Sequence, residues 1–364
     1  MLRTGLIGFP SVGKTTLFRL MTNQPDAPLG GHGRMEATVG VARVPDARLD
    51  RLTAMFEPRK RVPATVEFAD IGGMGRAAAQ ALLDVAPYRN ADALVHVVRS
   101  FRSESIAHAP GPLDPARDAQ AMEDELILAD LGVAEKRLDR IERDLKKART
   151  ADLERERDVL LRCRASLEEG SPLRALDLMD DDRRRLRGFQ FLSAKPLLVV
   201  INVDEADLAL LSQGSHAAHG AGLDAFLARA ATRAVPVCAT IELEIAELEA
   251  ADAAVFLADL GLAESGVDRV IRAAYDLLGY ISFFTVGEDE CRAWSIPRGT
   301  RALEAAGEIH TDIARGFIRA EVVGYDALIA RGSMAACREH GEVRLEGKEH
   351  VVQDGDIINF RFAT

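Results

Sequence analysis

Residues 8–15 read Gly8-Phe9-Pro10-Ser11-Val12-Gly13-Lys14-Thr15, which is the pattern G-x-x-x-x-G-K-T. The stretch follows a short apolar run, Leu2 to Ile7, and precedes a run of helical composition, Thr16 to Met21. A strand, a glycine-rich loop and a helix in this order form the context that a phosphate-binding loop requires. The sequence therefore predicts a P-loop nucleotide-binding domain at the start of the chain.

Each position of this loop has a physical role. Gly8 and Gly13 let the backbone bend so that successive N–H groups point at phosphate oxygens. Lys14 can reach the β- and γ-phosphates as a catalytic group, and the Thr15 hydroxyl can ligate Mg²⁺. The first turn of the following helix adds free N–H donors and its dipole. The residues predicted to bind the nucleotide here are Gly8, Ser11, Val12, Gly13, Lys14, Thr15 and Thr16.

Composition limits the other possibilities. The chain has 364 residues, 48% of them hydrophobic, and a formal net charge of −11. This length suggests two or three domains, and the charge argues against a generally basic nucleic-acid binder. No apolar run reaches the length of a membrane span, and the first predicted strand leaves no room for a signal peptide. We expect a cytoplasmic monomer with neither DNA nor a membrane as partner. The four cysteines are far apart and are expected to be reduced thiols: Cys163, Cys238, Cys291 and Cys337.

Short β-rich runs alternate with helical stretches along most of the chain. This alternation predicts an α/β fold with a doubly wound, mostly parallel sheet, which places ligands at the carboxyl ends of its strands. The predicted strands are Leu2 to Ile7, Val39 to Val44, Thr65 to Ala69, Leu94 to Val98, Leu197 to Ile201 and Val235 to Cys238.

The region from Ala116 to Phe191 interrupts this pattern and carries no strand signal. Apolar residues spaced by seven predict an inserted α-helical hairpin, or arm, with a coiled-coil seam. From Glu135 to Arg164 there are 11 Lys/Arg against 8 Asp/Glu. This excess fits either an ordinary solvated helix surface or an arm that contacts nucleic acid. The seam residues are Leu131, Ala134, Leu138, Ile141, Leu145, Ala148, Leu153, Leu160 and Leu167.

From Tyr280 onward the pattern changes to a compact α+β domain. The predicted strands are Ile281 to Val286, Cys291 to Ile296, Gly316 to Val322 and Asp356 to Phe362. We therefore expect a nucleotide-binding domain formed by residues 1–115 and 192–279, a helical insertion at 116–191, and a C-terminal domain at 280–364.

Two further motifs follow later strands. Asp70-Ile71-Gly72-Gly73 is a D-x-x-G, in which Asp70 can hold the Mg²⁺ water shell and the Gly73 N–H can sense a γ-phosphate. The alternative for Asp70 is a simple strand-end cap. Met74 stands where related hydrolases keep a glutamine that orients water, so any hydrolysis needs another group or is slow.

The base-reading loops are predicted after the fifth and sixth strands. Asn202-Val203-Asp204-Glu205 occupies the place of the N-K-x-D motif, and Asn202 suits a structural tie to the phosphate loop. Val203 and Glu205 replace the lysine and the aspartate that recognise guanine, and the alternative for Glu205 is a helix cap. Cys238 and Ala239 fit the last loop that contacts the base.

The chain resembles the Obg-like ATPases called YchF over nearly its whole length. The stretches that carry the resemblance are residues 8–15, Val44 to Leu49, His96 to Arg99, Glu125 to Leu131, Asn202 to Glu205, Arg292 to Trp294, Ile309 to Val322 and Arg344 to Phe362. The resemblance implies a P-loop domain, an inserted coiled-coil arm and a C-terminal TGS domain of β-grasp type. It also implies ATP binding and hydrolysis with Mg²⁺ and association with ribosomes, which we expect to contact the arm and the TGS domain.

Both switch regions depart from the family pattern. Arg34 stands in the place of the Mg²⁺-sensing threonine and Gly33 in the place of a cysteine, while Thr38 is a possible substitute. The second switch, Met74 to Ala91, is shorter and rich in alanine. The sequence thus predicts nucleotide binding with slow turnover. A non-catalytic, nucleotide-dependent binding module and a GTPase of the Obg class are the alternatives.

His108 matches a family histidine after the fourth strand. It either approaches the γ-phosphate as a catalytic helper or forms a local hydrogen bond within its loop.

Overall fold

The computed structural model describes residues 2–24, 37–71, 86–106, 108, 111–212 and 221–363. The chain divides into two compact units, one formed by Met1–Ala42 with Glu67–Leu277 and the other by Arg43–Val66 with Leu278–Thr364. In the described part of the chain, no helix combines the length and the apolar character needed to cross a membrane.

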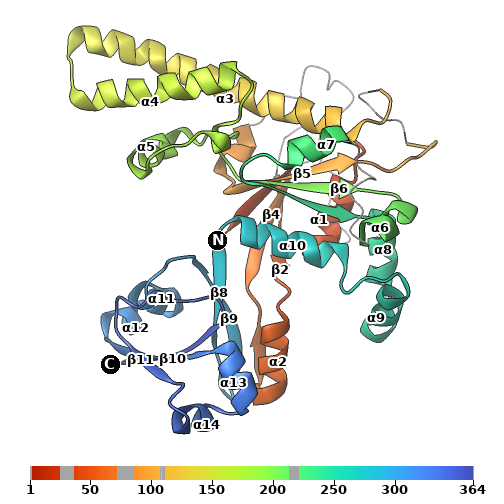
Figure 1. The fold of residues 1–364 in the computed structure, drawn as a ribbon, viewed down its shortest axis with the longest axis vertical. Helices are drawn as coiled ribbons and strands as arrows, with labels where there is room; N and C mark the ends of the chain where they lie inside the picture. Colours follow the sequence, from red (N-terminus) through yellow and green to blue (C-terminus); the bar gives the residue numbers. More distant parts are fainter. Residues whose placement is uncertain are drawn as a thin grey trace. The chain divides into compact units, whose positions relative to one another are not determined.

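The first unit is built on a six-stranded sheet of order β2-β4-β1-β5-β6-β7 (Figure 1). Strand β1 pairs in parallel with both β4 and β5, and β5-β6-β7 continue in parallel, as the sequence predicts. The strands span Arg3–Ile7 (β1), Ala37–Arg43 (β2), Thr65–Ile71 (β4), Ala93–Arg99 (β5), Leu197–Asn202 (β6) and Thr232–Val237 (β7).

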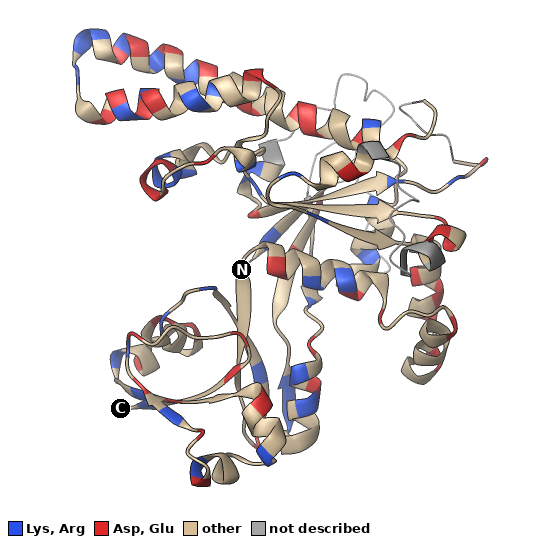
Figure 2. Ribbon diagram, in the orientation of Figure 1, with Lys and Arg blue, Asp and Glu red and all other residues tan. Residues whose placement is uncertain are grey.

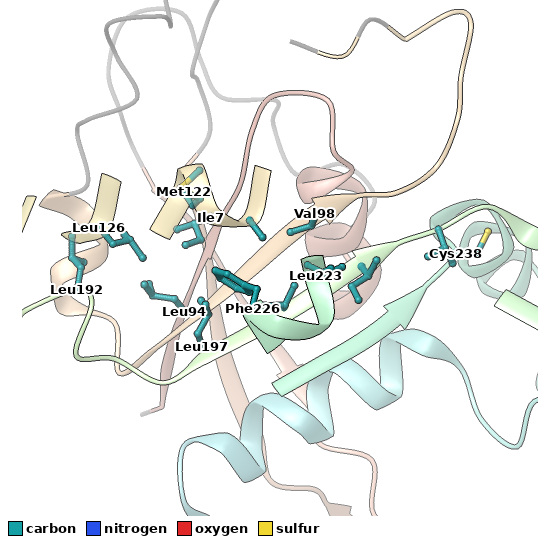
Figure 3. Packing of buried hydrophobic residues seen from close by; sticks show 14 of the residues in the cluster. Ile7, Leu94, Val98, Met122, Leu126, Leu192, Leu197, Leu223, Phe226 and Cys238 are labelled. Carbon is teal, nitrogen blue, oxygen red and sulfur yellow. The ribbon is translucent and has the colours of Figure 1, made fainter. Parts of the chain in front are cut away.

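Helices cover this sheet and bury its apolar side chains. Figure 3 shows Met122, from the long helix α3, and Phe226, from α7, packed over Leu94 and Leu197 of the sheet. Helix α10 packs against β7 and against α1. The helices of this unit outside the arm are α1 (Lys14–Thr22), α6 (Glu205–Ser212), α7 (Ala221–Leu227), α8 (Ala239–Glu247), α9 (Ala250–Asp259) and α10 (Gly266–Leu277), with a 3₁₀ turn η1 at Ala86–Asn90.

The inserted region is a helical hairpin formed by α3 (Pro115–Lys147) and α4 (Ala151–Glu168), followed by η2 (Leu173–Ala175), α5 (Asp180–Leu186) and η3 (Arg187–Phe189). Its apolar core contains the predicted seam, although Ala148 lies outside it as the exposed C-cap of α3. Arg137 of α3 and Glu156 of α4 join the two helices through bonds of 2.7 and 2.8 Å. The first part of α3 packs on the sheet, and its later part forms the hairpin with α4. The arm is therefore continuous with the nucleotide-binding domain.

The second unit contains a six-stranded sheet of order β11-β10-β12-β8-β9-β3. Its four longest strands match the predicted ones: β8 (Tyr280–Thr285), β9 (Glu290–Pro297), β10 (Phe317–Gly324) and β12 (Asp356–Phe362). The remaining elements are α2 (Ala47–Phe56), β3 (Lys60–Val62), β11 (Arg344–Glu346), α11 (Ala302–Ile309), α12 (Thr311–Arg315), α13 (Tyr325–Arg331) and α14 (Met334–Glu339).

Residues 43–66 are grouped differently from the domain boundaries that we expected from the sequence. Strand β3 pairs in parallel with β9, and Arg48 of α2 binds the Asp354 carboxylate while its guanidinium lies 5.2 Å from the centre of the Phe284 ring. A short early segment therefore completes a sheet built from the end of the chain. The strand β3 has only three residues, too few for a period-2 pattern to be recognised in the sequence.

Candidate nucleotide-binding site

The backbone of the phosphate loop can be formed only with glycine at two positions. Gly8 has φ +145° and Gly13 has φ +100°. A Cβ atom at Gly8 would lie 2.5 Å from the Val97 carbonyl oxygen, and one at Gly13 would lie 2.5 Å from Nδ2 of Asn202. Both distances are shorter than van der Waals contact. Ser11 also has a positive φ, +62°, which is uncommon for a residue with a side chain.

Lys14 begins helix α1 directly after this loop. Its Nζ atom donates to the carbonyl oxygens of Gly8 at 2.9 Å and Phe9 at 2.6 Å. Burial lowers the pKa of Lys14 to about 8, although nearby Asp70 acts in the opposite direction. Gly13 caps α1 without a side-chain hydrogen bond, so the first N–H groups of the helix are available to an anion.

Thr15 and Asp70 form the pair that would hold a divalent cation. The Thr15 hydroxyl donates to Oδ2 of Asp70 at 3.0 Å, and Asp70 is only 4% exposed at the carboxyl end of β4. A hydroxyl and a carboxylate are hard oxygen donors, which suit Mg²⁺ together with phosphate oxygens and water. The described residues contain no group of three or more His, Cys, Asp or Glu side chains that could hold a metal ion without such outside ligands.

Asn202 connects the phosphate loop to the last predicted base loop. Its Nδ2 donates to the Val12 carbonyl at 3.0 Å, and its Oδ1 accepts from the Ala239 backbone N–H at 3.1 Å. The structural tie expected from the sequence is therefore present. The Cys238 side chain is buried, and its sulfur lies 3.1 Å from the Thr240 hydroxyl.

The two other predicted residues of the base loop differ in exposure. Val203 is 2% exposed and belongs to the core under the sheet, so its side chain is not available to a nucleotide. Glu205 is exposed at the start of α6. Between them in the chain, Asp204 accepts from the Arg102 backbone N–H at 3.2 and 3.3 Å and joins this loop to the segment after β5. No motif predicts this role for Asp204, because the contact is between loops far apart in the chain.

Two further titratable groups, neither predicted as a site residue, have pKa values that loss of water shifts strongly. His96 on β5 pairs with Ile7 in the sheet, and burial together with Lys14 and Arg174 lowers the pKa of His96 to about 3. Burial and Asp70 raise the pKa of Tyr88 well above its ordinary value. Both side chains are thus neutral near pH 7.

His108 makes the local contacts of a loop histidine. Its Nδ1 lies 2.8 Å from the Gly111 carbonyl oxygen, and its Nε2 lies 2.8 Å from Oδ2 of Asp118 in the first turn of α3. Both ring nitrogens therefore face acceptor oxygens. These are the contacts of the structural alternative, and a catalytic role for His108 stays a prediction.

Some predictions fall outside the described residues. They concern Gly73, the substitutions at Gly33 and Arg34, and residues 74–85 of the second switch. Thr38 is described and lies in β2.

A glycine loop at the end of β1, a lysine and threonine at the start of α1, and an aspartate on the neighbouring strand define a P-loop nucleotide-binding protein. Family models agree with this class. Residues 3–130 match a model described as "50S ribosome-binding GTPase", and residues 280–363 match a model of the YchF C-terminal domain, itself described as a protein of unknown function.

Relatives of known name cover the chain from end to end. The "Ribosome-binding ATPase YchF" of Bacillus subtilis is 41% identical over 367 residues, covering 99% of both chains. The protein of the same name from Escherichia coli O157:H7 is 38% identical, again over 99% of both. A solved structure described as "Structure of the Schizosaccharomyces pombe YchF GTPase" is 28% identical, with a TM-score of 0.81 over 99% of this chain and 97% of that one. The chain belongs to the YchF family.

Proposed function

We propose that this protein binds ATP with Mg²⁺, hydrolyses it slowly, and associates with ribosomes in the cytoplasm as a monomer. The observation that carries the nucleotide chemistry is the arrangement of Lys14, Thr15 and Asp70 around a loop whose glycines cannot be replaced. The relatives' name, ribosome-binding ATPase, supports both the reaction and the partner.

Each residue has a defined task in this proposal. Lys14 moves from the loop carbonyls to the β- and γ-phosphates, while the N–H groups of α1 bind phosphate oxygens. Thr15 and Asp70 would hold Mg²⁺, which would neutralise charge that develops on the phosphates. Gly73 senses the γ-phosphate through its backbone N–H. His108 can assist only if it leaves its contacts with Gly111 and Asp118.

The choice between ATP and GTP rests on the base loop. In a guanine site the last carboxylate of N-K-x-D accepts two hydrogen bonds from the base, and losing them removes about 1.5–3 kcal/mol per bond. Glu205 is one methylene longer than that aspartate, and buried Val203 cannot lie over a base. We therefore propose ATP as the preferred substrate. GTP is the alternative, favoured by the name GTPase that the Schizosaccharomyces pombe relative carries.

Isothermal titration with ATP, ADP, GTP and GDP at fixed Mg²⁺ tests this choice. We expect tighter binding of ATP than of GTP, and a gain in GTP affinity for Glu205→Asp. Replacing Val203 with lysine would disturb the core, so the single variant is the cleaner comparison. Tighter GTP than ATP binding by the unmodified protein would overturn the proposed substrate.

The proposed ribosome contact uses the arm together with the C-terminal TGS domain. Most cations of α3 and α4 lie beside carboxylates, and Figure 2 shows the two charges intermixed along the arm. Lys146, Lys147 and Arg149 lie exposed around the turn between the two helices, and only Lys147 approaches a carboxylate, at 4.0 Å. The end of the hairpin is thus the part of the arm most suited to RNA phosphates.

Ribosome co-sedimentation at increasing salt tests this proposal. We expect replacement of Lys146, Lys147 and Arg149 by alanine to weaken binding and to reduce the salt dependence by about one unit of slope for each phosphate that is no longer neutralised. Arg140→Ala is the matched control, since Arg140 is exposed on the same helix but lies seven residues before the helix ends at Lys147. Equal co-sedimentation of the triple variant and the control would exclude this end of the arm.

A non-catalytic binding module remains the second candidate, favoured by Met74 and by the altered first switch. Single-turnover assays distinguish the two: phosphate release from bound ATP supports the slow ATPase, and tight binding without release supports the module.

A further inference from the structure

The hairpin formed by α8 and α9 carries a surface of unusual composition. From Ala234 to Asp268 the sequence has eight Asp and Glu residues and no Lys, Arg or His, in a chain where 46 of 364 residues are Lys or Arg. Figure 2 accordingly shows α8 and α9 without any blue. This region is therefore negatively charged along its whole length.

Three of the eight carboxylates have roles inside the fold. Glu242 is buried and accepts the Gly266 and Val267 backbone N–H groups at 2.7 and 3.2 Å, Glu264 pairs with Arg272, and Asp268 is half-buried at the start of α10. The other five are exposed and form no ion pair with any residue that the structure describes. They are Glu244, Glu247, Glu249, Asp252 and Asp259.

Large apolar side chains are exposed among these carboxylates. The exposed fractions are 45% for Leu243, 40% for Leu248 and 61% for Val255. Helix α9 has no buried residue, and only its Phe256 side and the following Leu260 pack against the core. Ala251, Val255 and Ala258 follow one another at i, i+4 and i+7, so α9 presents an apolar stripe outward.

The hairpin is anchored firmly enough to present this stripe without rearrangement. Helix α8 packs against α1, the helix that begins with Lys14, and Glu242 in the first turn of α8 accepts the Gly266 N–H at the start of α10. The first residue of α8, Ala239, donates to Asn202. A preformed apolar surface binds at a smaller entropic cost than a mobile one.

We propose that the outer face of α8 and α9 is a docking surface for a basic, amphipathic segment of a protein partner. Exposed apolar area favours a partner with apolar side chains, and five unpaired carboxylates favour one whose remaining side chains are Lys or Arg. The same carboxylates repel RNA phosphates. They also repel the same face of a second copy of this chain. The proposal goes beyond ribosome contact through the arm and does not depend on it.

Fluorescence anisotropy with the full chain tests this proposal. The probe is a labelled synthetic helical peptide of Leu and Lys, with leucines along one face. A second peptide, in which glutamine replaces each leucine, has the same charge, and a labelled single-stranded RNA, titrated without peptide, represents the other class of partner. We expect the unmodified protein to bind the Leu/Lys peptide more tightly than the Gln/Lys peptide, and RNA binding to be unchanged when the exposed apolar side chains of α8 and α9 are replaced.

Variants then locate the binding. Leu243→Ser with Val255→Ser removes exposed apolar area and retains the charge, so we expect roughly tenfold weaker peptide binding or more. Val351→Ser, 42% exposed on the other unit, is the matched control and should leave the affinity unchanged. An unchanged melting profile is expected because the replaced side chains are on the surface. Equal affinity of the double variant and the control, equal affinity for both peptides, or weaker RNA binding by the double variant than by the unmodified protein would each overturn the proposal.

Discussion

Replacing Asn202 with alanine removes a side chain that joins the phosphate loop to the start of α8. Asn202 is 3% exposed, so the Val12 carbonyl and the Ala239 N–H both lose a buried partner. A buried polar group left without a hydrogen bond costs about 1–3 kcal/mol, which gives roughly 2–6 kcal/mol for the two groups together. At about 2–4 °C per kcal/mol, the melting temperature should fall by at least about 4 °C.

Thermal and urea unfolding of the nucleotide-free protein measure this loss, and titration with ATP measures the effect on binding. We expect weaker ATP binding as well, because the loop backbone that carries the phosphate donors is no longer held. Asn90→Ala, at an exposed asparagine of the same unit, is the control and should change stability by less than about 0.5 kcal/mol. A loss for Asn202→Ala no larger than the control's would refute the structural role of this residue.

Three further predictions concern the loop and His108. Lys14→Ala should abolish nucleotide binding in titration while the melting profile stays intact, and unchanged affinity would contradict the phosphate-loop assignment. Burial holds the pKa of Lys14 near 8, so its charge is present below that pH and lost above it. The ATP affinity of the unmodified protein should therefore fall above about pH 8, by a factor that approaches ten per pH unit. An ATP affinity that does not change from about pH 8 to 9.5 would argue against this. His108→Ala should lower the melting temperature, because it breaks the contacts with Gly111 and Asp118. If His108 also acts in catalysis, single-turnover hydrolysis will fall with ATP affinity unchanged, and an unaltered rate would leave it a structural residue.

The local parts of the site could be predicted because each depends on a few neighbouring residues. The glycine loop, the strand before it and the helix after it occupy consecutive positions, so their pattern appears directly in the sequence. The heptad spacing of the arm is also a local pattern, and Leu138 and Leu160 are buried as that spacing predicts. The role of Asn202 could be predicted because the N-K-x-D motif implies a contact with the phosphate loop, and the G-x-x-x-x-G-K-T motif identifies that loop.

Contacts between distant segments could not be predicted in this way. Asp204 binds the Arg102 N–H, and His108 binds Asp118, but no local pattern distinguishes these carboxylates from solvated ones. The burial of Val203 was missed for a similar reason: the motif suggested a position facing the base, while the end of a parallel strand places the side chain in the core. Strand β3 was missed because it is short and pairs with a strand more than two hundred residues away.

Lys14 shows how a ligand-free loop can be prepared for phosphate. Its ammonium group is already buried and bonded to two carbonyl oxygens, which carry only partial negative charge. The lowered pKa shows that these partners do not compensate for the loss of water. A triphosphate offers full negative charges in the same low-dielectric surroundings, where their attraction to Lys14 is stronger than in water. We therefore expect binding to raise the pKa of Lys14, and above about pH 8 we expect the protein to take up a proton together with its nucleotide. The charge that we expect to bind the triphosphate is thus already desolvated by the fold.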